Sequence, residues 1–105
     1  MSTITLTSIT CVELQDSITH DETEVRINGV KVAGPFAIRK NQTIPLGGIT
    51  RTFTGSVNVQ LFEMDSNSAD DNLGSNLVGA SPVTNNTLEF KAANKAFYTM
   101  KYSVV

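Results

Sequence analysis

Apolar and polar residues alternate in short runs along this chain, and this period of two limits its fold more than any other feature. In the clearest run, residues 52–63, the apolar residues Val57, Val59 and Leu61 fall on one side of an extended strand. Apolar residues spaced by three and four, which would indicate amphipathic helices, are nearly absent. Threonine, valine and isoleucine fill the runs, and glycine, asparagine, aspartate and proline separate them. The pattern predicts an all-β protein.

The runs predict a single antiparallel β-sandwich of about eight short strands. The expected strand segments are residues 4–14, 24–27, 30–32, 36–38, 42–46, 52–63, 76–83, 87–90 and 98–104. Asn28-Gly29 favours a tight hairpin turn, because both residues tolerate positive φ. A change of phase near Thr7-Ser8 indicates a β-bulge, and Gly47-Gly48 indicates a turn. A chain of 105 residues has room for one domain, residues 1–105.

Charge and cysteine content narrow the classes of function. The net charge is −2 and the pI is about 5.2, so no overall basic field attracts nucleic acid, and we expect no nucleic-acid partner. The single cysteine, Cys11, excludes an internal disulfide framework and is expected to be a small buried side chain. The sequence has neither the pattern of a signal peptide nor an apolar run of membrane-spanning length, so we expect a soluble protein of open localisation.

Acidic residues gather in two of the expected loops. The loop after the first strand contains Asp16, Asp21 and Glu22, and the segment after the central strand contains Glu63, Asp65, Asp70 and Asp71. Glu63 and Asp65 are two residues apart, so both continue the face of Leu61. Two neighbouring carboxylates on a core face repel each other and lose solvation unless a cation compensates them. The spacing therefore predicts a cation site.

The available ligands favour calcium over other metals. Ca²⁺ takes six to eight oxygen ligands in flexible geometry, which suits carboxylates carried by loops. Mg²⁺ requires a stricter octahedron with fewer protein ligands. Zinc would need a group of histidines or thiolates, and the chain has one histidine and one cysteine. We expect Ca²⁺ as the cofactor.

The segment from Glu63 to Gly74 resembles the third calcium-binding loop of C2 domains. That family has an acid, a second acid two residues later and a third acid eight residues after the first, followed by an aliphatic residue and glycine. The corresponding positions here are Glu63, Asp65, Asp71, Leu73 and Gly74. Residues 57–62 are similar to the strand that leads into this loop in C2 domains.

The first acidic loop shows a weaker likeness to the same family. C2 domains carry two acids six residues apart ahead of a strand, and Asp16 and Glu22 have this separation, with Asp21 as the competing second acid. The chain departs from the family in having Glu63 where aspartate is usual and in lacking the Asp-Pro-Tyr segment after the first loop. The resemblance therefore implies a short, bacterial-type C2-like variant.

Three uses of a calcium-ordered sandwich stay open. The first is a non-catalytic module in which calcium orders the two loops and supports docking to a protein partner or larger assembly. The second is calcium-dependent phospholipid binding, which is less favoured because the tip Ser66-Asn67-Ser68 is polar and Ile18 is the one large apolar residue of the other loop. The third is carbohydrate binding, which the absence of tryptophan and the inward parity of Tyr98 and Tyr102 disfavour.

Sequence motifs give little support to catalysis. His20 is the only histidine and lies next to Asp21, but no nucleophile or second acid–base group can be tied to it. The chain has neither a Gly-x-Ser-x-Gly elbow nor a glycine-rich phosphate loop. We expect a binding protein rather than an enzyme.

Overall fold

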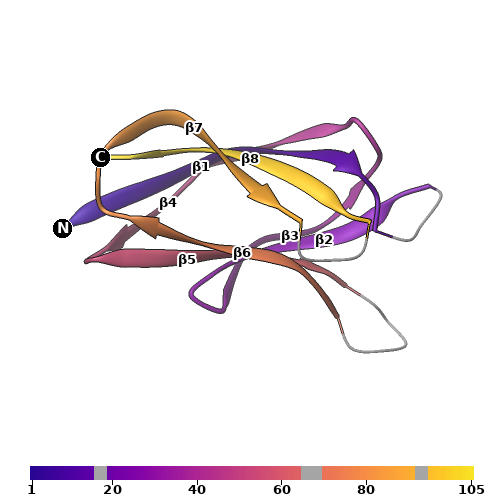
Figure 1. Ribbon diagram of the computed structural model, residues 1–105, viewed down its shortest axis with the longest axis horizontal. Coiled ribbons are helices and arrows are strands. Elements are labelled where there is room, and N and C mark those ends of the chain that lie inside the picture. Colours follow the sequence, from indigo (N-terminus) through magenta and orange to yellow (C-terminus); the bar gives the residue numbers. More distant parts are fainter. Residues whose placement is uncertain (16–18, 65–69, 92–94) are drawn as a thin grey trace.

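A computed structural model describes residues 1–15, 19–64, 70–91 and 95–105 as a sandwich of two sheets (Figure 1). The strands are β1 (Ser2–Glu13), β2 (Asp21–Ile27), β3 (Val30–Ile38), β4 (Thr43–Phe53), β5 (Ser56–Glu63), β6 (Asp71–Gly79), β7 (Val83–Phe90) and β8 (Phe97–Val104). They form two four-stranded antiparallel sheets with the orders β4-β1-β8-β7 and β3-β2-β5-β6. The predicted all-β sandwich is confirmed.

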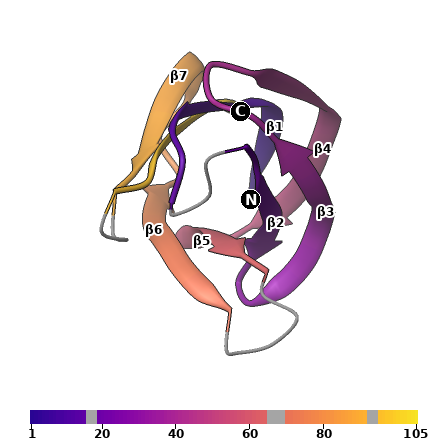
Figure 2. The ribbon, with the colours of Figure 1, turned by 90° about the vertical axis from the view of Figure 1, so that its right-hand side faces the viewer.

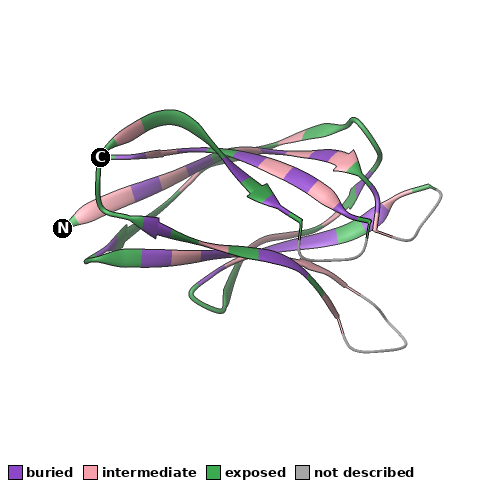
Figure 3. Cartoon of the chain, in the orientation of Figure 1, coloured by how far each residue is buried: buried purple, intermediate pink, exposed green. Residues whose placement is uncertain are grey.

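The core lies between the sheets and is built by the alternation seen in the sequence. Along β5, the inward residues Val57, Val59 and Leu61 are buried, while the intervening residues are partly exposed. Buried and more exposed residues alternate in the same way along β8, as the bands in Figure 3 show. The core also takes in Cys11, as expected. The period of two thus places the hydrophobic side chains where the two sheets meet.

Two local predictions are confirmed. Asn28 and Gly29 have φ values of 51° and 81°, which is the backbone of the tight turn that joins β2 to β3. The register of β1 shifts between Leu6 and Ser8 against both of its neighbours, β4 and β8, so the bulge lies where the phase changes.

Two other predictions are wrong. The expected strand over residues 52–63 is two strands, because the chain bends at Thr54-Gly55 and crosses from one sheet to the other. Gly47-Gly48 does not form a turn between strands. Both glycines lie inside β4, where they fall in the register shift between the Leu6–Ile49 and Ser8–Pro45 pairs.

The chain termini lie at one end of the sandwich, and the described acids of β2, β5 and β6 lie toward the other. Strands β1, β3, β5 and β7 all finish at one end, where β2, β4, β6 and β8 begin (Figures 1 and 2). Both termini lie at the opposite end. The described acids at the start of β2, the end of β5 and the start of β6 are therefore neighbours in space.

Candidate functional site

Three of the predicted metal-binding residues meet where β2, β5 and β6 pair. Glu63 ends β5 and lies directly opposite Asp71, the first residue of β6. The backbone N–H of Glu22 donates to Glu63 Oε2 at 3.3 Å, and the N–H of Met64 donates to the carbonyl oxygen of Glu22 at 2.7 Å. Backbone pairing thus brings Glu22, Glu63 and Asp71 to one corner of the sheet.

Asp21 has a different environment from its neighbour Glu22. Its side chain is 1% exposed, and its Oδ2 accepts hydrogen bonds from the Tyr98 hydroxyl and from the N–H of Gln15 at 2.9 Å. Its Oδ1, like Gln15 Oε1 and Thr23 Oγ1, is buried and has no hydrogen-bond partner among the described residues. Asp21 therefore lies beneath the acidic corner, inside the sandwich.

The buried hydroxyl beside Asp21 is held in its neutral form. Burial, together with the hydrogen bond to Asp21, raises the pKa of Tyr98 well above its usual value. Burial also raises the pKa of the Cys11 thiol, against a smaller opposing effect of its hydrogen bond with Tyr98. The Tyr98 hydroxyl and the Cys11 thiol therefore keep their protons beneath the acidic corner.

An ion-pair cluster that the sequence did not indicate lies on the outer face of the same sheet. Arg26 Nε is 2.6 Å from Glu24 Oε2, its Nη2 is 3.7 Å from Asp70 Oδ2, and its guanidinium lies 4.0 Å from the centre of the Phe62 ring. Glu24 is 6% exposed, although it points away from the core. Alternation along the strand predicts that Glu24 points away from the core, because its neighbour Val25 points into it. The sequence does not show which neighbouring side chains cover Glu24.

The remaining predicted ligands cannot be placed. Asp16 and Asp65 lie outside the described residues. Within the part of the chain that the structure does describe, no three His, Cys, Asp or Glu residues lie close enough together to hold a metal ion. Glu22 has His20 as a neighbour, with Nε2 and Oε1 3.5 Å apart. No basic side chain among the described residues pairs with Asp71.

Comparison with known proteins gives a fold but no sequence relative. No family model matches the chain, and no curated protein matches it. The structure is similar to that of the two C2 domains, A and B, of extended synaptotagmin 2, at a TM-score of 0.61 and 14% identity over 98% of this chain and 39% of that one. It is also similar to the first C2 domain, domain A, of plant extended synaptotagmin 1, at a TM-score of 0.59 and 9% identity over 98% of this chain and 90% of that one.

These similarities establish the architecture as that of a C2 domain, which confirms the fold that the loop motif implied. This chain spans well under half of the two-domain structure and nearly all of the single plant domain. The described residues include no helix with the length and hydropathy needed to cross a membrane.

Proposed function

We propose that this chain is a non-catalytic calcium-binding module of C2 type, in which calcium draws the two acidic loops together and so supports docking to a protein partner or larger assembly. The observation that carries the proposal is the direct opposition of Glu63 and Asp71 across β5 and β6, with Glu22 bonded to the Glu63 carboxylate through its N–H. Asp16 and Asp65 complete the proposed ligand set, and Asp21 supports it from beneath.

The electrostatics of the corner favour a bound cation. Like charges directly opposite each other on paired strands are destabilising. His20 lies beside Glu22 and Arg26 beside Asp70, but no basic side chain among the described residues pairs with Asp71. Glu22, Glu63 and Asp71 also fit calcium chemically, because all their donor atoms are hard oxygens. Bound calcium would supply the compensating charge at this corner.

Docking to protein is favoured over the other uses of the site. Lipid binding by the loops is the alternative, and it is less favoured because the loop tip Ser66-Asn67-Ser68 is polar in sequence. Sugar binding at Tyr98 is disfavoured because its ring is fully buried and its hydroxyl is bonded to Asp21. Catalysis is disfavoured because the sequence around His20, which contacts Thr19 and Glu22, has no motif of a known nucleophile.

The first test is thermal unfolding with calcium or with chelator. At calcium a hundredfold above its dissociation constant, the stabilisation is about 2.7 kcal/mol, which for a domain of this size raises Tm by roughly 10 °C. The double variant Asp65→Asn, Asp71→Asn should abolish the rise. In chelator, the same variant should have a slightly higher Tm than the native chain, because it removes like-charge repulsion.

Glu89→Gln is the matched control, since Glu89 is an exposed acid of β7 that pairs with Lys91 at 3.4 Å. It should keep the full calcium response. A Tm that is the same in calcium and in chelator would contradict calcium binding. Co-sedimentation with vesicles that contain phosphatidylserine distinguishes the two uses: no calcium-dependent binding is expected, and clear binding would replace protein docking by the lipid alternative.

A further inference from the structure

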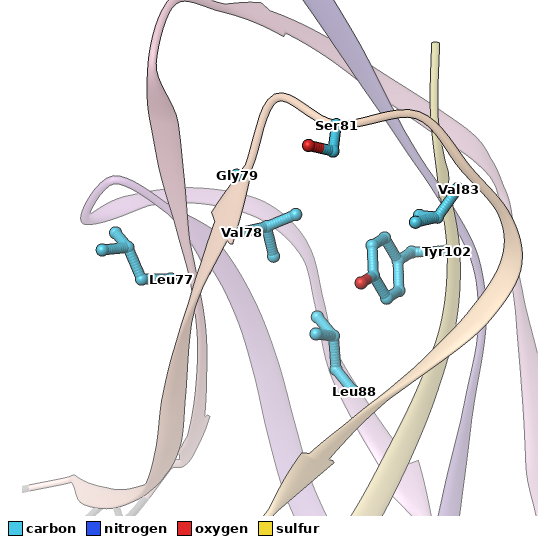
Figure 4. A pocket seen from close by; sticks show the side chains of 7 residues that line it. All are labelled: Leu77, Val78, Gly79, Ser81, Val83, Leu88 and Tyr102. Atoms are coloured by element: carbon cyan, nitrogen blue, oxygen red, sulfur yellow. The ribbon is translucent and has the colours of Figure 1, made fainter.

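A cavity of about 330 Å³ lies at the end of the sandwich opposite the acidic loops. It is enclosed by the end of β6, the connection that follows it, β7 and β8 (Figure 4). The side chains of Val78, Val83, Leu88 and Tyr102 point into this space, with Ser81 at its rim, while Leu77 points away from it. The cavity is thus separate from the proposed calcium site.

The cavity is formed because β6 and β7 approach each other closely over only part of their length. At Gly74, a Cβ atom would lie 3.1 Å from the Cα of Phe90, so the two strands touch there. The next contact along the seam is a hydrogen bond of 2.8 Å from Asn76 Nδ2 to the Glu89 carbonyl oxygen. Toward the far end β7 shifts register against β8 between Val83 and Asn86, and there the cavity lies between the strands.

The lining combines apolar walls with the hydroxyl of a tyrosine. Val78, Leu88 and Tyr102 are 5%, 8% and 7% exposed. The hydroxyl of Tyr102 points into the cavity, where it is open to solvent, and no described residue forms a hydrogen bond with it. The hydroxyl is therefore free to donate a hydrogen bond to a molecule in the cavity. Small-molecule sites have this composition, with mostly hydrophobic walls and a few polar groups that fix the orientation of the ligand.

We propose that this cavity binds a small apolar molecule with a single hydrogen-bond acceptor, which accepts a hydrogen bond from the Tyr102 hydroxyl. At about 30 Å³ for each water-sized group, the volume holds roughly ten non-hydrogen atoms. A sugar fits poorly, because most of its hydroxyls would face the aliphatic side chains without partners. A metal ion fits poorly as well, because the lining contains no acidic, histidine or cysteine side chain.

The test uses 1-hexanol as the probe and methyl chemical shifts as the readout. Saturable shifts are expected for Val78, Val83 and Leu88, with none for Ile38 at the acidic end, and with a dissociation constant on the order of 1 mM for so small a ligand. 1,6-Hexanediol should bind at least tenfold more weakly, because its second hydroxyl would be buried without a partner. Equal binding of the two alcohols, or the absence of saturable shifts with 1-hexanol, would overturn the proposal.

Two variants separate the roles of space and hydrogen bonding. Tyr102→Phe removes only the hydroxyl and should weaken hexanol binding about fivefold. Val83→Phe should fill the cavity and abolish binding, whereas Val30→Phe, at an exposed position of the β2–β3 hairpin, should have no effect. If Val83→Phe does not fold, the comparison of Tyr102→Phe with the native chain still tests whether hexanol binds in this cavity. Unchanged affinity in Tyr102→Phe would overturn the assigned hydrogen bond.

Discussion

Asp21 shows how one buried carboxylate can organise the interior of this sandwich. Its carboxylate accepts hydrogen bonds from the Tyr98 hydroxyl on β8 and from the N–H of Gln15 in the segment after β1. Asp21 therefore links three parts of the chain. Hydrogen bonds to charged groups contribute more to stability than neutral ones. A carboxylate that is 1% exposed depends on such donors, because water cannot replace them.

Removing the Tyr98 hydroxyl should therefore destabilise the fold. We expect Tyr98→Phe to lower the free energy of unfolding by about 1.5–3 kcal/mol, measured by urea denaturation in chelator. Tyr102→Phe is the matched control, since that hydroxyl has no hydrogen-bond partner among the described residues, and it should change stability by less than about 0.5 kcal/mol. Equal losses in the two variants would show that the bond to Asp21 has no special weight.

Tyr98 should also make the free energy of unfolding depend on pH in the alkaline range. The pKa of Tyr98 is raised in the folded protein above the value of about 10 for an unfolded tyrosine. Its contribution to stability is therefore complete below pH 10 and declines as pH rises further, because only the unfolded state loses the proton. Above about pH 10 the native chain should lose up to about 1.4 kcal/mol per pH unit more than Tyr98→Phe. Parallel pH profiles for the two proteins would contradict this.

The different environments of Asp21 and Glu22 could have been predicted from sequence. Val25 and Ile27 mark the inward side of β2, and extending their parity back along the strand puts Thr23 and Asp21 inside and Glu22 outside. The partners of Asp21 could not be predicted, because Gln15 and Tyr98 reach it only through tertiary packing. The sequence thus predicts which residues belong to the candidate site. It does not predict what each of them contacts.

At the scale of elements, the outer face of β2 carries a charged cluster in which one carboxylate is nearly buried. Glu24 is almost fully buried by its neighbours, and Arg26 provides its ion pair. Arg26 also contacts the Phe62 ring on β5 and Asp70 just before β6. One guanidinium therefore connects three successive elements of this sheet beside the acidic corner.

Breaking this cluster on one side should be costly. Arg26→Gln leaves the Glu24 carboxylate buried without its cation, and we expect a loss of about 3–5 kcal/mol in urea denaturation. The double variant Arg26→Gln, Glu24→Gln should recover much of that loss, because the uncompensated charge is gone. Additive effects of the two substitutions would show that the pair is not coupled.

A second basic residue offers a control with similar contacts but more exposure. Lys91 lies 3.4 Å from Glu89 and 4.5 Å from the centre of the Phe97 ring, and both charged side chains are more than half exposed. Lys91→Gln should cost less than about 1 kcal/mol, since surface ion pairs are weak. The contrast between Arg26 and Lys91 thus isolates the effect of burying the charged partner.

Strand boundaries show what local patterns can and cannot indicate. The alternation from residue 52 to residue 63 continues while the chain changes sheets at Thr54-Gly55, because a period of two is the same in either sheet. Gly47-Gly48 has the composition of a turn, yet pairing with β1 on both sides of these glycines keeps them within one strand, β4. Strand pairing, which is not local, decided both cases.

At the scale of the whole molecule, the acidic residues are confined to one half. The chain has ten of them, and apart from Asp16 and Asp65, which are not described, each lies in or next to the part of its strand near the acidic corner. At the opposite strand ends lie Lys31, Arg51 and both chain termini, without an aspartate or glutamate among the described residues. Aspartates and glutamates are therefore unevenly placed along the 41 Å length of the molecule, although Arg26, Arg39, Lys40, Lys91 and Lys95 lie near the same end.

This asymmetry predicts that the calcium-free protein is sensitive to ordinary salt. Repulsion among the acids is local, since the Debye length is already about 10 Å at 0.1 M salt, much shorter than the molecule. Raising sodium chloride from about 10 mM to about 300 mM in chelator should screen the repulsion and raise Tm by several degrees. In saturating calcium the same change should have little effect or lower Tm, because the repulsion is already compensated and salt then screens an attraction.

The charge at β6 decides whether the acidic corner is the source of that response. Asp71→Asn should show a smaller rise of Tm with salt in chelator than the native chain, while Glu89→Gln, on β7 of the other sheet, should respond like the native chain. Equal responses in all three proteins would assign the salt effect to general screening instead of the Glu63–Asp71 pair. The confinement of acids to one end would then be a matter of solubility rather than of a site built to hold a cation.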